Sequence, residues 1–219
     1  MTKKKLYVSN SPESIRLFEN SFMEALSKVH FSVPLFIFIP VIFYSGYLAL
    51  TADSIGIKDF VGWFMLGLLA WTAIEYIMHR FVFHFHPTSE WGKKMHFIFH
   101  GIHHDYPCDR LRLVLPPSVS IPLATAFFFL WRSFIPSPGL YAFFSAFILG
   151  YLIYDMFHYA IHHLNVKGKL WDQLKTHHLK HHYVDPDKGF GVSSPLWDHL
   201  VRSNFIEKKE ETKVLEHHS

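Results

Sequence analysis

Histidines gather in four short clusters, and this pattern constrains the chain more than any other feature of its sequence. Of the 18 histidines, all but His30, His217 and His218 lie between His79 and His199. The clusters read HRFVFH from residue 79, HFIFHGIHH from 96, HYAIHH from 158 and HHLKHH from 177. Neutral imidazole is a common metal ligand, and spacings of three or four residues place two rings on one face of a helix. Four such clusters predict a metal-binding protein.

Four apolar segments predict an all-α integral membrane protein. They lie at about 31–50, 60–78, 118–135 and 139–158, in a chain of which 50% is hydrophobic. Each is close to the ~20 residues that a helix needs to cross a bilayer. A soluble bundle with an apolar core is disfavoured, because the polar residues form separate blocks rather than helix faces. We therefore expect one domain over residues 1–206, with four transmembrane helices and a cytoplasmic helical cap that carries a histidine-rich site for two metal ions.

Lysine and arginine are distributed asymmetrically around these segments. They are frequent before the first, between the second and third and after the fourth, whereas the two opposite connections carry only Lys58 and Arg132. The positive-inside rule then places both termini, the central loop and every histidine cluster in the cytoplasm. This bias explains the net charge of +3, so no nucleic-acid partner is expected. The lone Cys108 excludes an intramolecular disulfide, in keeping with a reducing face.

The two ends of the chain carry patterns of their own. Ser11 and Pro12 resemble the N-cap and the first residue of a helix. An apolar stripe follows at helical spacing: Ile15, Phe18, Phe22 and Leu26. It predicts a helix that lies in the membrane interface or packs on the cap. No cleavable signal peptide is expected, and the charged tail 207–219, whose ending LEHHS could derive from a vector, is expected to be disordered.

The number of plausible ligands favours two metal ions over one. A single ion has four to six coordination positions, whereas two ions with about five nitrogens each and a shared open position use ten. No carboxylate lies among the histidines at ligand spacing, which argues against a Glu-x-x-His di-iron bundle. The candidate ligands are His79, His84, His100, His103, His104, His158, His162, one of His177 and His178, His181 and His182.

His79 and His84 differ from the other pairs because they are five residues apart. On an ideal helix this step turns a side chain by about 140°, so the two rings cannot share a face. We expect the second span to unwind or bulge near His79. The two rings would then face different ions or reach one ion from two directions.

The remaining histidines are expected to support the site or the fold rather than to bind metal. They are His96, His163, His199 and the other member of the pair His177 and His178, while His30 and His86 are expected to be unrelated. Asp155 lies three residues before His158 on one helix face. It is expected either to accept the proton on the other nitrogen of a ligand or to make a local cap or lysine pair.

Three longer motifs resemble those of the membrane fatty acid hydroxylase superfamily, and specifically of the fatty-acid 2-hydroxylases of sphingolipid acyl chains. They read HGIHHDYPCDRLRLVLPP at 100–117, YDMFHYAIHH at 154–163 and LKTHHLKHHY at 174–183. The resemblance extends from about Ser11 to His199, although desaturases, sterol C4-methyl oxidases and carotenoid hydroxylases share the histidine boxes alone. It implies the same ten ligands and selects His178, leaving His177 as a supporting residue.

The resemblance also implies a reaction and its requirements. Two iron ions would use O2 and external electrons to hydroxylate C2 of an acyl chain, free or in a sphingolipid. Zinc has no redox chemistry but binds such nitrogens tightly, so it could occupy the site in purified protein. Eukaryotic relatives often carry a fused cytochrome b5 domain, for which this chain has no motif, so we expect a separate cytochrome b5-like or ferredoxin-like donor. The membrane would be the plasma membrane of a bacterium or the endoplasmic reticulum of a eukaryote.

The substrate is expected to enter from the bilayer between the apolar ends of the spans. Arg110 and Arg112 could hold a polar headgroup or simply contribute to the cytoplasmic positive charge. Three tyrosines, Tyr106, Tyr154 and Tyr159, could position the substrate or anchor the chain at the interface.

Other functions are less well supported by the sequence. Sterol desaturation and carotenoid hydroxylation use the same histidine boxes. A zinc hydrolase would need a general base, as in the absent motif H-E-x-x-H, and a haem protein would need paired histidines inside the membrane. Metal buffering would not require histidines at the ends of spans.

Overall fold

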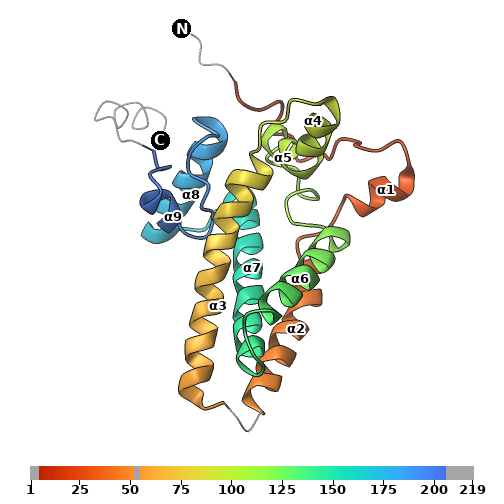
Figure 1. The fold of residues 1–219 in the computed structure, drawn as a ribbon. Coiled ribbons are helices and arrows are strands. Elements are labelled where there is room, and N and C mark those ends of the chain that lie inside the picture. The colour runs from red at the N-terminus through yellow and green to blue at the C-terminus, as the bar shows by residue number, and fades with distance from the viewer. Residues whose placement is uncertain (1–4, 52–54, 206–219) are drawn as a thin grey trace.

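The computed structural model describes residues 5–51 and 55–205, and in these residues the chain forms helices and no strand (Figure 1). Three long helices lie side by side: α2 (Val33–Leu50), α3 (Ile57–Ile77) and α7 (Gly139–His163). Shorter helices gather mainly at one end of this bundle: α1 (Ser21–Leu26), α4 (Glu90–His96), α5 (Ile102–Asp105), α8 (Lys169–Tyr183) and α9 (Leu196–Leu200). The predicted all-α class is confirmed, while the predicted disorder of 207–219 lies outside the described residues.

Three helical segments are long and apolar enough to cross a membrane. They are Val33–Leu50, Ile57–Phe83 and Gly139–His163. The segment predicted at 118–135 forms the helix α6 (Pro117–Arg132), which has only 16 residues. At 1.5 Å per residue it is about 24 Å long, short of the ~30 Å hydrocarbon core. In the described part of the chain, three of the four predicted spans therefore reach the required length.

Glycines allow α3 and α7 to approach closely along the centre of the bundle. A Cβ atom on Gly67 would lie 2.1 Å from the carbonyl oxygen of Phe143, and one on Gly150 would lie 2.6 Å from Cγ of Trp71. Small residues commonly permit such contacts between helices in membranes. Because α7 also packs against α2 and α6, it is buried along most of its length.

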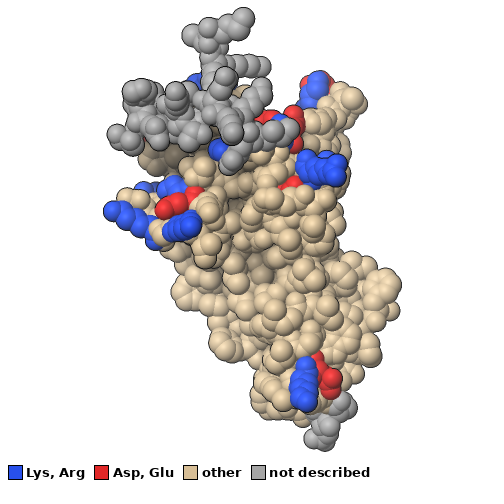
Figure 2. Space-filling model, turned by 90° about the vertical axis from the view of Figure 1, so that its left-hand side faces the viewer, with Lys and Arg blue, Asp and Glu red and all other residues tan. Residues whose placement is uncertain are grey.

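The outer faces of α2 and α3 expose large apolar side chains. The most exposed are Phe36, Phe43, Ile57, Tyr44 and Tyr47. Figure 2 shows one face of the molecule, where charged side chains gather at the two ends and leave a broad uncharged surface between them. A continuous apolar surface of this size is rare on soluble monomers. Together with the long apolar helices, it indicates a membrane protein.

The N-terminal segment does not form the long helix that its apolar stripe predicts. Helix α1 begins only at Ser21, where the Asn20 side chain caps it. Before the cap, the backbone N–H groups of Leu17 and Phe18 donate to the carboxylate of Glu24 at 2.9 and 3.0 Å. This carboxylate satisfies backbone groups that a helix would have paired internally, so the prediction was wrong.

Glu24 itself is held by a buried ion pair with Arg112. The guanidinium donates to Glu24 at 2.6 Å, and it also donates to the Ile15 carbonyl and the Ser27 hydroxyl at 2.8 Å each. The Arg112 side chain is 3% exposed and the Glu24 side chain is 11% exposed. Burial alone would raise the pKa of Glu24, but bonds from Lys28 and two backbone N–H groups, with the charge of Arg112, lower that pKa to about 2. Arg112 is thus engaged in joining α1 to the segment before α6.

We predict that Glu24→Gln destabilises the fold by about 3 kcal/mol, because the buried Arg112 loses its carboxylate partner at 2.6 Å and keeps only the more distant Asp109, 3.5 Å from its Nε atom. Thermal or denaturant unfolding of the detergent-solubilised protein measures this effect. Glu90→Gln is the matched control, since Glu90 pairs with Lys93 but is 90% exposed. The control should change stability by at most about 1 kcal/mol. Equal losses in the two variants would contradict the structural role of Glu24.

The same ion pair predicts a dependence of stability on pH. The pKa of Glu24 is about 2 in the fold, below its usual 4.5. Its stabilising effect is therefore complete above about pH 4.5 and is lost as the pH falls towards about 2. We expect the difference in Tm between the wild type and Glu24→Gln to narrow over this range. A constant difference would rule out this linkage.

Candidate metal centre

Ten histidines form two groups of five at the end of the bundle where the short helices gather. Group A consists of His79, His84, His100, His104 and His181. Group B consists of His103, His158, His162, His178 and His182. Within each group, one ring nitrogen of every member lies within 4.8 Å of the others. The structure thus brings together the ten histidines that the resemblance implies as ligands.

A π-helical turn places His79 and His84 in the same group. Helix α3 continues into the π-helix η1 (Met78–Phe83), and the N–H of His84 donates to the carbonyl of His79 at 3.1 Å. A π-turn is wider than an α-turn, so residues five apart come to lie on one side. The two ring centroids are 5.0 Å apart. The bulge that the five-residue spacing predicts is therefore present.

Two helices contribute to both groups and hold them next to each other. The segment formed by the π-helix η2 (Phe97–Gly101) and α5 gives His100 and His104 to group A and His103 to group B. Helix α8 gives its three buried histidines to both groups in the same way. The rings of His104 and His182 stack across the boundary with centroids 4.2 Å apart. The two groups are therefore neighbours.

The distances between nitrogens match those around a shared metal ion. In group A, the Nε2 atom of His100 lies 3.1 Å from the Nε2 atoms of His79, His84 and His104. In group B, Nε2 of His178 lies 3.1 Å from Nε2 of both His162 and His182. Two imidazole nitrogens bound to one ion at ~2.1 Å and at right angles would be ~3.0 Å apart. One ring N–H cannot satisfy three such contacts, whereas a central cation can.

Backbone carbonyls fix the protonation of two rings in group A. Nδ1 of His79 donates to the carbonyl of Phe190, and Nδ1 of His181 donates to the carbonyl of Lys188 at 2.7 Å. With the proton on Nδ1, the Nε2 lone pair of each ring is directed into the group. Lone pairs that face one another repel unless a cation lies between them. The donor set therefore fits a metal ion in each group.

Burial keeps the imidazoles in the neutral form that binds metal. Desolvation lowers the pKa of His100, His103 and His104 well below 6.5, and the neighbouring rings lower it further. The same two causes lower the pKa of His178 and His182. Since protonated imidazole cannot be a ligand, neutral rings at pH 7 are what a metal site requires.

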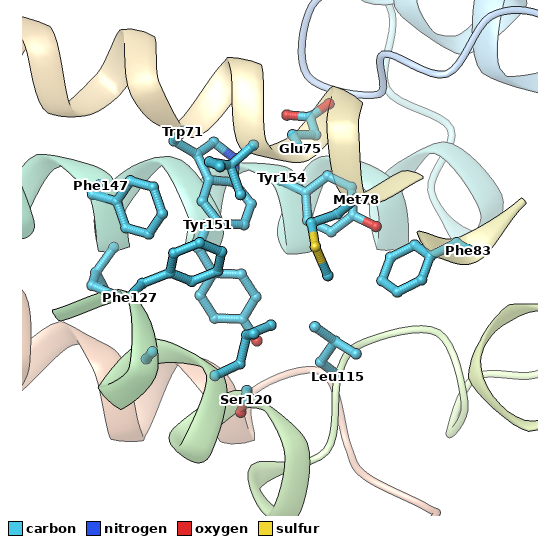
Figure 3. Close-up of a pocket in the computed structure, with 14 residues that line it drawn as sticks. Trp71, Glu75, Met78, Phe83, Leu115, Ser120, Phe127, Phe147, Tyr151 and Tyr154 are labelled. Atoms are coloured by element: carbon cyan, nitrogen blue, oxygen red, sulfur yellow. The ribbon is translucent and has the colours of Figure 1, made fainter. Parts of the chain in front are cut away.

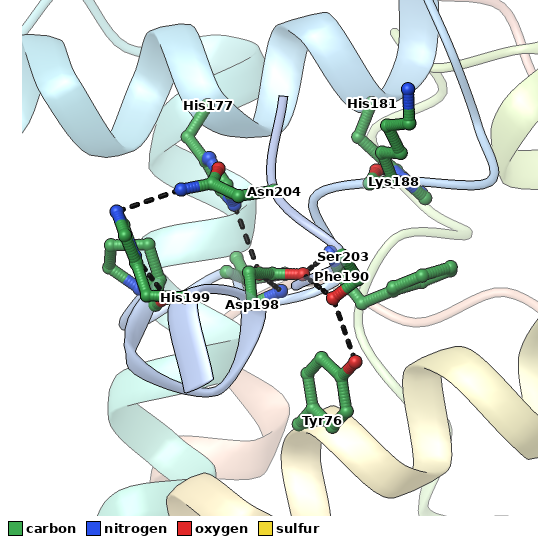
Figure 4. A network of polar contacts seen from close by, with 12 residues as sticks. Tyr76, His177, His181, Lys188, Phe190, Asp198, His199, Ser203 and Asn204 are labelled. Carbon is green, nitrogen blue, oxygen red and sulfur yellow. Dashed lines mark hydrogen bonds and ion pairs between the residues drawn. The ribbon is translucent and has the colours of Figure 1, made fainter. Parts of the chain in front are cut away.

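Two buried carboxylates hold the loop that supplies the carbonyl of Phe190. Asp198 accepts hydrogen bonds from the N–H groups of Phe190 and Gly191 at 3.0 and 2.8 Å, and from the hydroxyl of Ser203 at 2.7 Å (Figure 4). His177 donates to the same carboxylate at 3.1 Å. Burial would raise the pKa of Asp198, but these hydrogen bonds lower it, so the carboxylate is charged.

Glu75 is the second carboxylate, and it connects the loop to α3. Its Oε1 atom accepts from the N–H groups of Val192 and Ser193 at 2.7 and 2.8 Å. Glu75 lies one helical turn before His79 on the same helix. A single residue of α3 therefore ties the loop behind group A to the helix that carries its first histidine.

An apolar cavity ends beside the two groups. It lies between α3, α6 and α7 and encloses about 540 Å³, including the part that is open to the surroundings (Figure 3). At one end, Phe83 stacks on His100 with ring centroids 5.2 Å apart, and Tyr154 lies 5.6 Å from His158. None of the ten histidines lines the cavity itself, so Phe83 and Tyr154 lie between a molecule in the cavity and the candidate metal centre.

Comparison with known proteins places the chain in a family. A family model described as fatty acid hydroxylase matches residues 64–203, which include all ten histidines. The chain belongs to the fatty acid hydroxylase family. This confirms the resemblance that the histidine motifs indicate.

Individual relatives extend the similarity beyond the matched region. The rat fatty acid 2-hydroxylase is 38% identical over 218 residues, covering 90% of this chain and 58% of that protein. A dihydroceramide fatty acyl 2-hydroxylase of Arabidopsis thaliana is 36% identical and covers 85% of this chain and 78% of that protein. The solved hydroxylase domain of full-length scs7p superposes with a TM-score of 0.80 at 35% identity, covering 86% of this chain and 71% of that one. The chain thus spans less than two thirds of the rat relative.

The histidines predicted to support the metal site lie outside both groups. His96 packs against Phe85, and His163 packs against Tyr159. His177 contacts Asp198, as described above, whereas the exposed His199 bonds to Asn204. Of these four, His177 is the one that takes part in the network behind group A.

Asp155 does not make the hydrogen bond that the sequence predicts. It is fully buried, but neither of its carboxylate oxygens nor Nδ1 of His158 has a hydrogen-bond partner among the described residues. The role expected of Asp155 is instead filled by Asp198 and Glu75, acting through the loop carbonyls. Sequence analysis missed both, although an acidic residue inside an apolar span is itself a sign of function.

The residues predicted to contact substrate lie in different environments. Tyr154 lines the apolar cavity, whereas Tyr159 stacks on Phe31 with centroids 4.4 Å apart. Arg110 is exposed, and Tyr106 is half-buried at the end of α5. Because the guanidinium of Arg112 is bound by protein oxygens, Arg110 is the arginine of this pair that is open to a headgroup.

We predict that Asp198→Asn weakens metal binding by roughly tenfold. Asparagine offers one acceptor oxygen in place of two, so part of the loop that orients His79 loses its anchor. Competition with a chelator, followed by metal analysis, measures the affinity. Asp187→Asn is the control, because Asp187 is exposed and faces only His86 at 3.6 Å. If the two variants retained metal equally well, the loop would not support the site.

Proposed function

We propose that this chain hydroxylates C2 of a fatty acyl chain, free or within a sphingolipid, at a centre of two iron ions. The observation that carries this proposal is the apolar cavity that ends at Phe83 and Tyr154, whose rings pack on His100 and His158. An acyl chain fits such a cavity, and its carboxyl end would then lie at the histidines. The rat and Arabidopsis relatives, named as fatty acid 2-hydroxylase and dihydroceramide fatty acyl 2-hydroxylase, support the same reaction and substrate class.

Groups A and B are the proposed ligands of the two ions. Five neutral nitrogens would hold each ion and leave room for a further ligand, and no charged side chain among them would offset the positive charge of the metal. Iron held there would supply the activation of O2 and the removal of hydrogen from C2. Zinc in the same ligands would preserve the fold but lack this chemistry.

The protein's own part in the reaction is to position the chain and exclude water. Met78, Phe83 and Tyr154 surround the inner end of the cavity, where they shield the reacting carbon. Arg110, Tyr106 and Tyr159 are the candidates for contact with the headgroup outside it. A lipid with its polar end near α5 and its chain in the cavity would present C2 to the open positions.

The reaction also needs a source of electrons. One oxygen atom of O2 enters the hydroxyl group and the other leaves as water, which consumes two electrons and two protons. Histidine side chains supply neither electron, so we propose a separate electron-donor protein of the cytochrome b5 or ferredoxin type as a partner. A donor would approach from the cap that covers the two groups.

We further propose that the cap faces the cytoplasm. The distribution of lysine and arginine around the spans supports this orientation through the positive-inside rule. Helix α6 would be a fourth, short span that enters the bilayer beside α7. Its 16 residues require local thinning of the bilayer or flanking side chains that reach the interface.

We predict that His104→Ala and His162→Ala each remove metal and abolish hydroxylation, with product falling by more than about 100-fold. The first variant tests group A and the second tests group B. His199→Ala is the control, because His199 is exposed and belongs to neither group. Metal analysis and product analysis are read together, and full activity with metal retained in either variant would refute the ligand assignment.

Product analysis under ¹⁸O2 tests the function as a whole. Cells that express the chain should contain acyl chains with one ¹⁸O atom at C2, and cells that express His104→Ala should not. Mass spectrometry of total lipids identifies the position of the label. Label in sterols or carotenoids instead of acyl chains would overturn the proposal and favour another reaction of the histidine-box enzymes.

A further inference from the structure

We propose that an aromatic plug, formed by Trp71, Phe127 and Phe147, sets the length of the acyl chain that the protein accepts. The plug closes the end of the apolar cavity farthest from the histidines (Figure 3). This inference rests on the proposed function, because it takes an acyl chain to be the occupant. Two yeast relatives are named as ceramide very long chain fatty acid hydroxylases, but no relative's name gives a length limit for this chain or the residues that set it.

The three plug residues come from three helices, and Phe147 contacts the other two. The Phe147 ring lies 5.3 Å from Trp71 of α3 and 5.2 Å from Phe127 of α6, measured between centroids. Trp131 backs the plug from the far side, at 5.8 Å from Phe147. Phe147 is 1% exposed. Aromatic rings packed edge to face in this way form a dense barrier with little room for a chain to pass.

The cavity wall runs along α7 from this plug to Tyr154, whose ring lies 5.6 Å from that of His158 in group B. On α7, Phe147, Tyr151, Tyr154 and His158 recur at spacings of four, three and four residues, which places them on one helix face. Figure 3 shows Phe147, Phe127 and Trp71 at one end of the cavity and Phe83 and Leu115 at the other. A chain that lies along this face therefore has one end at the histidines and the other at the plug.

The length of this wall, calculated from the rise of α7, gives the number of carbons in a chain that fits. Phe147 and His158 are 11 residues apart on α7, which corresponds to about 16.5 Å at 1.5 Å per residue. An extended polypeptide advances about 3.6 Å over three backbone bonds, so an extended chain advances roughly 1.2 Å per bond. About 14 bonds fit between C2 and the plug. The fitting chain therefore has about 16 carbons.

Length selectivity follows from how well a chain fills the cavity. A shorter chain leaves apolar surface uncovered, and each buried methylene is worth roughly fourfold in binding. A longer chain meets the plug before C2 reaches the histidines, so it must bend or move sideways. The wild type should therefore prefer chains of about 16 carbons over both shorter and much longer ones.

Ala124→Phe tests the proposal by moving the closed end of the cavity towards the histidines. Ala124 lines the cavity three residues before Phe127 on α6, about 4.5 Å nearer the entrance. The added ring should shift the preferred chain down by about four carbons. Ala126→Phe is the matched control, because Ala126 is on the same helix but is exposed and does not line the cavity. It should leave the preference of the wild type unchanged.

Phe127→Ala tests the opposite direction by removing part of the plug. The preferred chain should become longer by at least about two carbons, since the lost ring leaves space beyond the closed end of the wild-type cavity. Phe129→Ala is its control, because Phe129 lies on the same helix and is 58% exposed. The two pairs together keep the proposal testable even if one variant is unstable.

Two measurements separate a failure of the plug from a failure of the proposed function. The first is the length distribution of 2-hydroxylated products from an equal mixture of acyl chains. The second is thermal stabilisation of the purified protein by saturated fatty acids of graded length, without reductant, which reports binding without turnover.

A shorter preferred chain in Ala124→Phe and a longer one in Phe127→Ala, with unchanged controls, support the plug. Shifts in binding alone, with no hydroxylated product even from the wild type, would support the plug but refute the hydroxylase. Active variants whose products have the same length distribution as those of the wild type would refute the plug. The chain would then leave the cavity sideways between α3 and α6.

Discussion

Imidazole nitrogens whose lone pairs face one another at about 3 Å repel, and the ten histidines of groups A and B are held in this arrangement inside the protein. Burial adds to the cost, because it denies each ring the water that would otherwise satisfy it. A cation in each group turns the same arrangement from repulsive to attractive. Group A takes rings from η1 and the residue after it, η2, α5 and α8, and group B from α5, α7 and α8. Metal binding would therefore join the cap to the long helices.

The orientation of the histidines depends on buried carboxylates that do not belong to either group. Glu75 and Asp198 bind the backbone of the loop at 190–193, and carbonyls from this region orient His79 and His181. Both carboxylates act through the backbone rather than on the rings themselves. This arrangement keeps negative charge away from the proposed ions while it fixes the direction of their ligands. The proposed metal centre can therefore be both strongly electrophilic and rigid.

The cavity and the histidines share the helices α3 and α7, which the close contacts at Gly67 and Gly150 hold in a fixed register. Fixed register matters because it keeps Trp71 of α3 beside Phe147 of α7, with ring centroids 5.3 Å apart. The same two helices would determine where the metal lies, where the chain ends and which carbon reacts. Helix α6, which packs on α7 and is short, supplies the remaining wall.

The sequence by itself determined the helical class, the apolar segments and nine of the ten histidines, because each is a local pattern of spacing or composition, while the family resemblance selected His178 over His177. It also predicted the bulge at His79, since a five-residue step cannot share a face on an α-helix. It failed at the N-terminus, where Glu24 satisfies the backbone in place of a helix, and at Asp155, whose spacing to His158 did not yield a bond. Only the tertiary structure decided which five histidines share a group, because neighbours such as His103 and His104 turn to opposite sides. It alone revealed the roles of Glu75, Asp198 and the aromatic plug, since these arise from contacts between residues up to 118 positions apart in the chain.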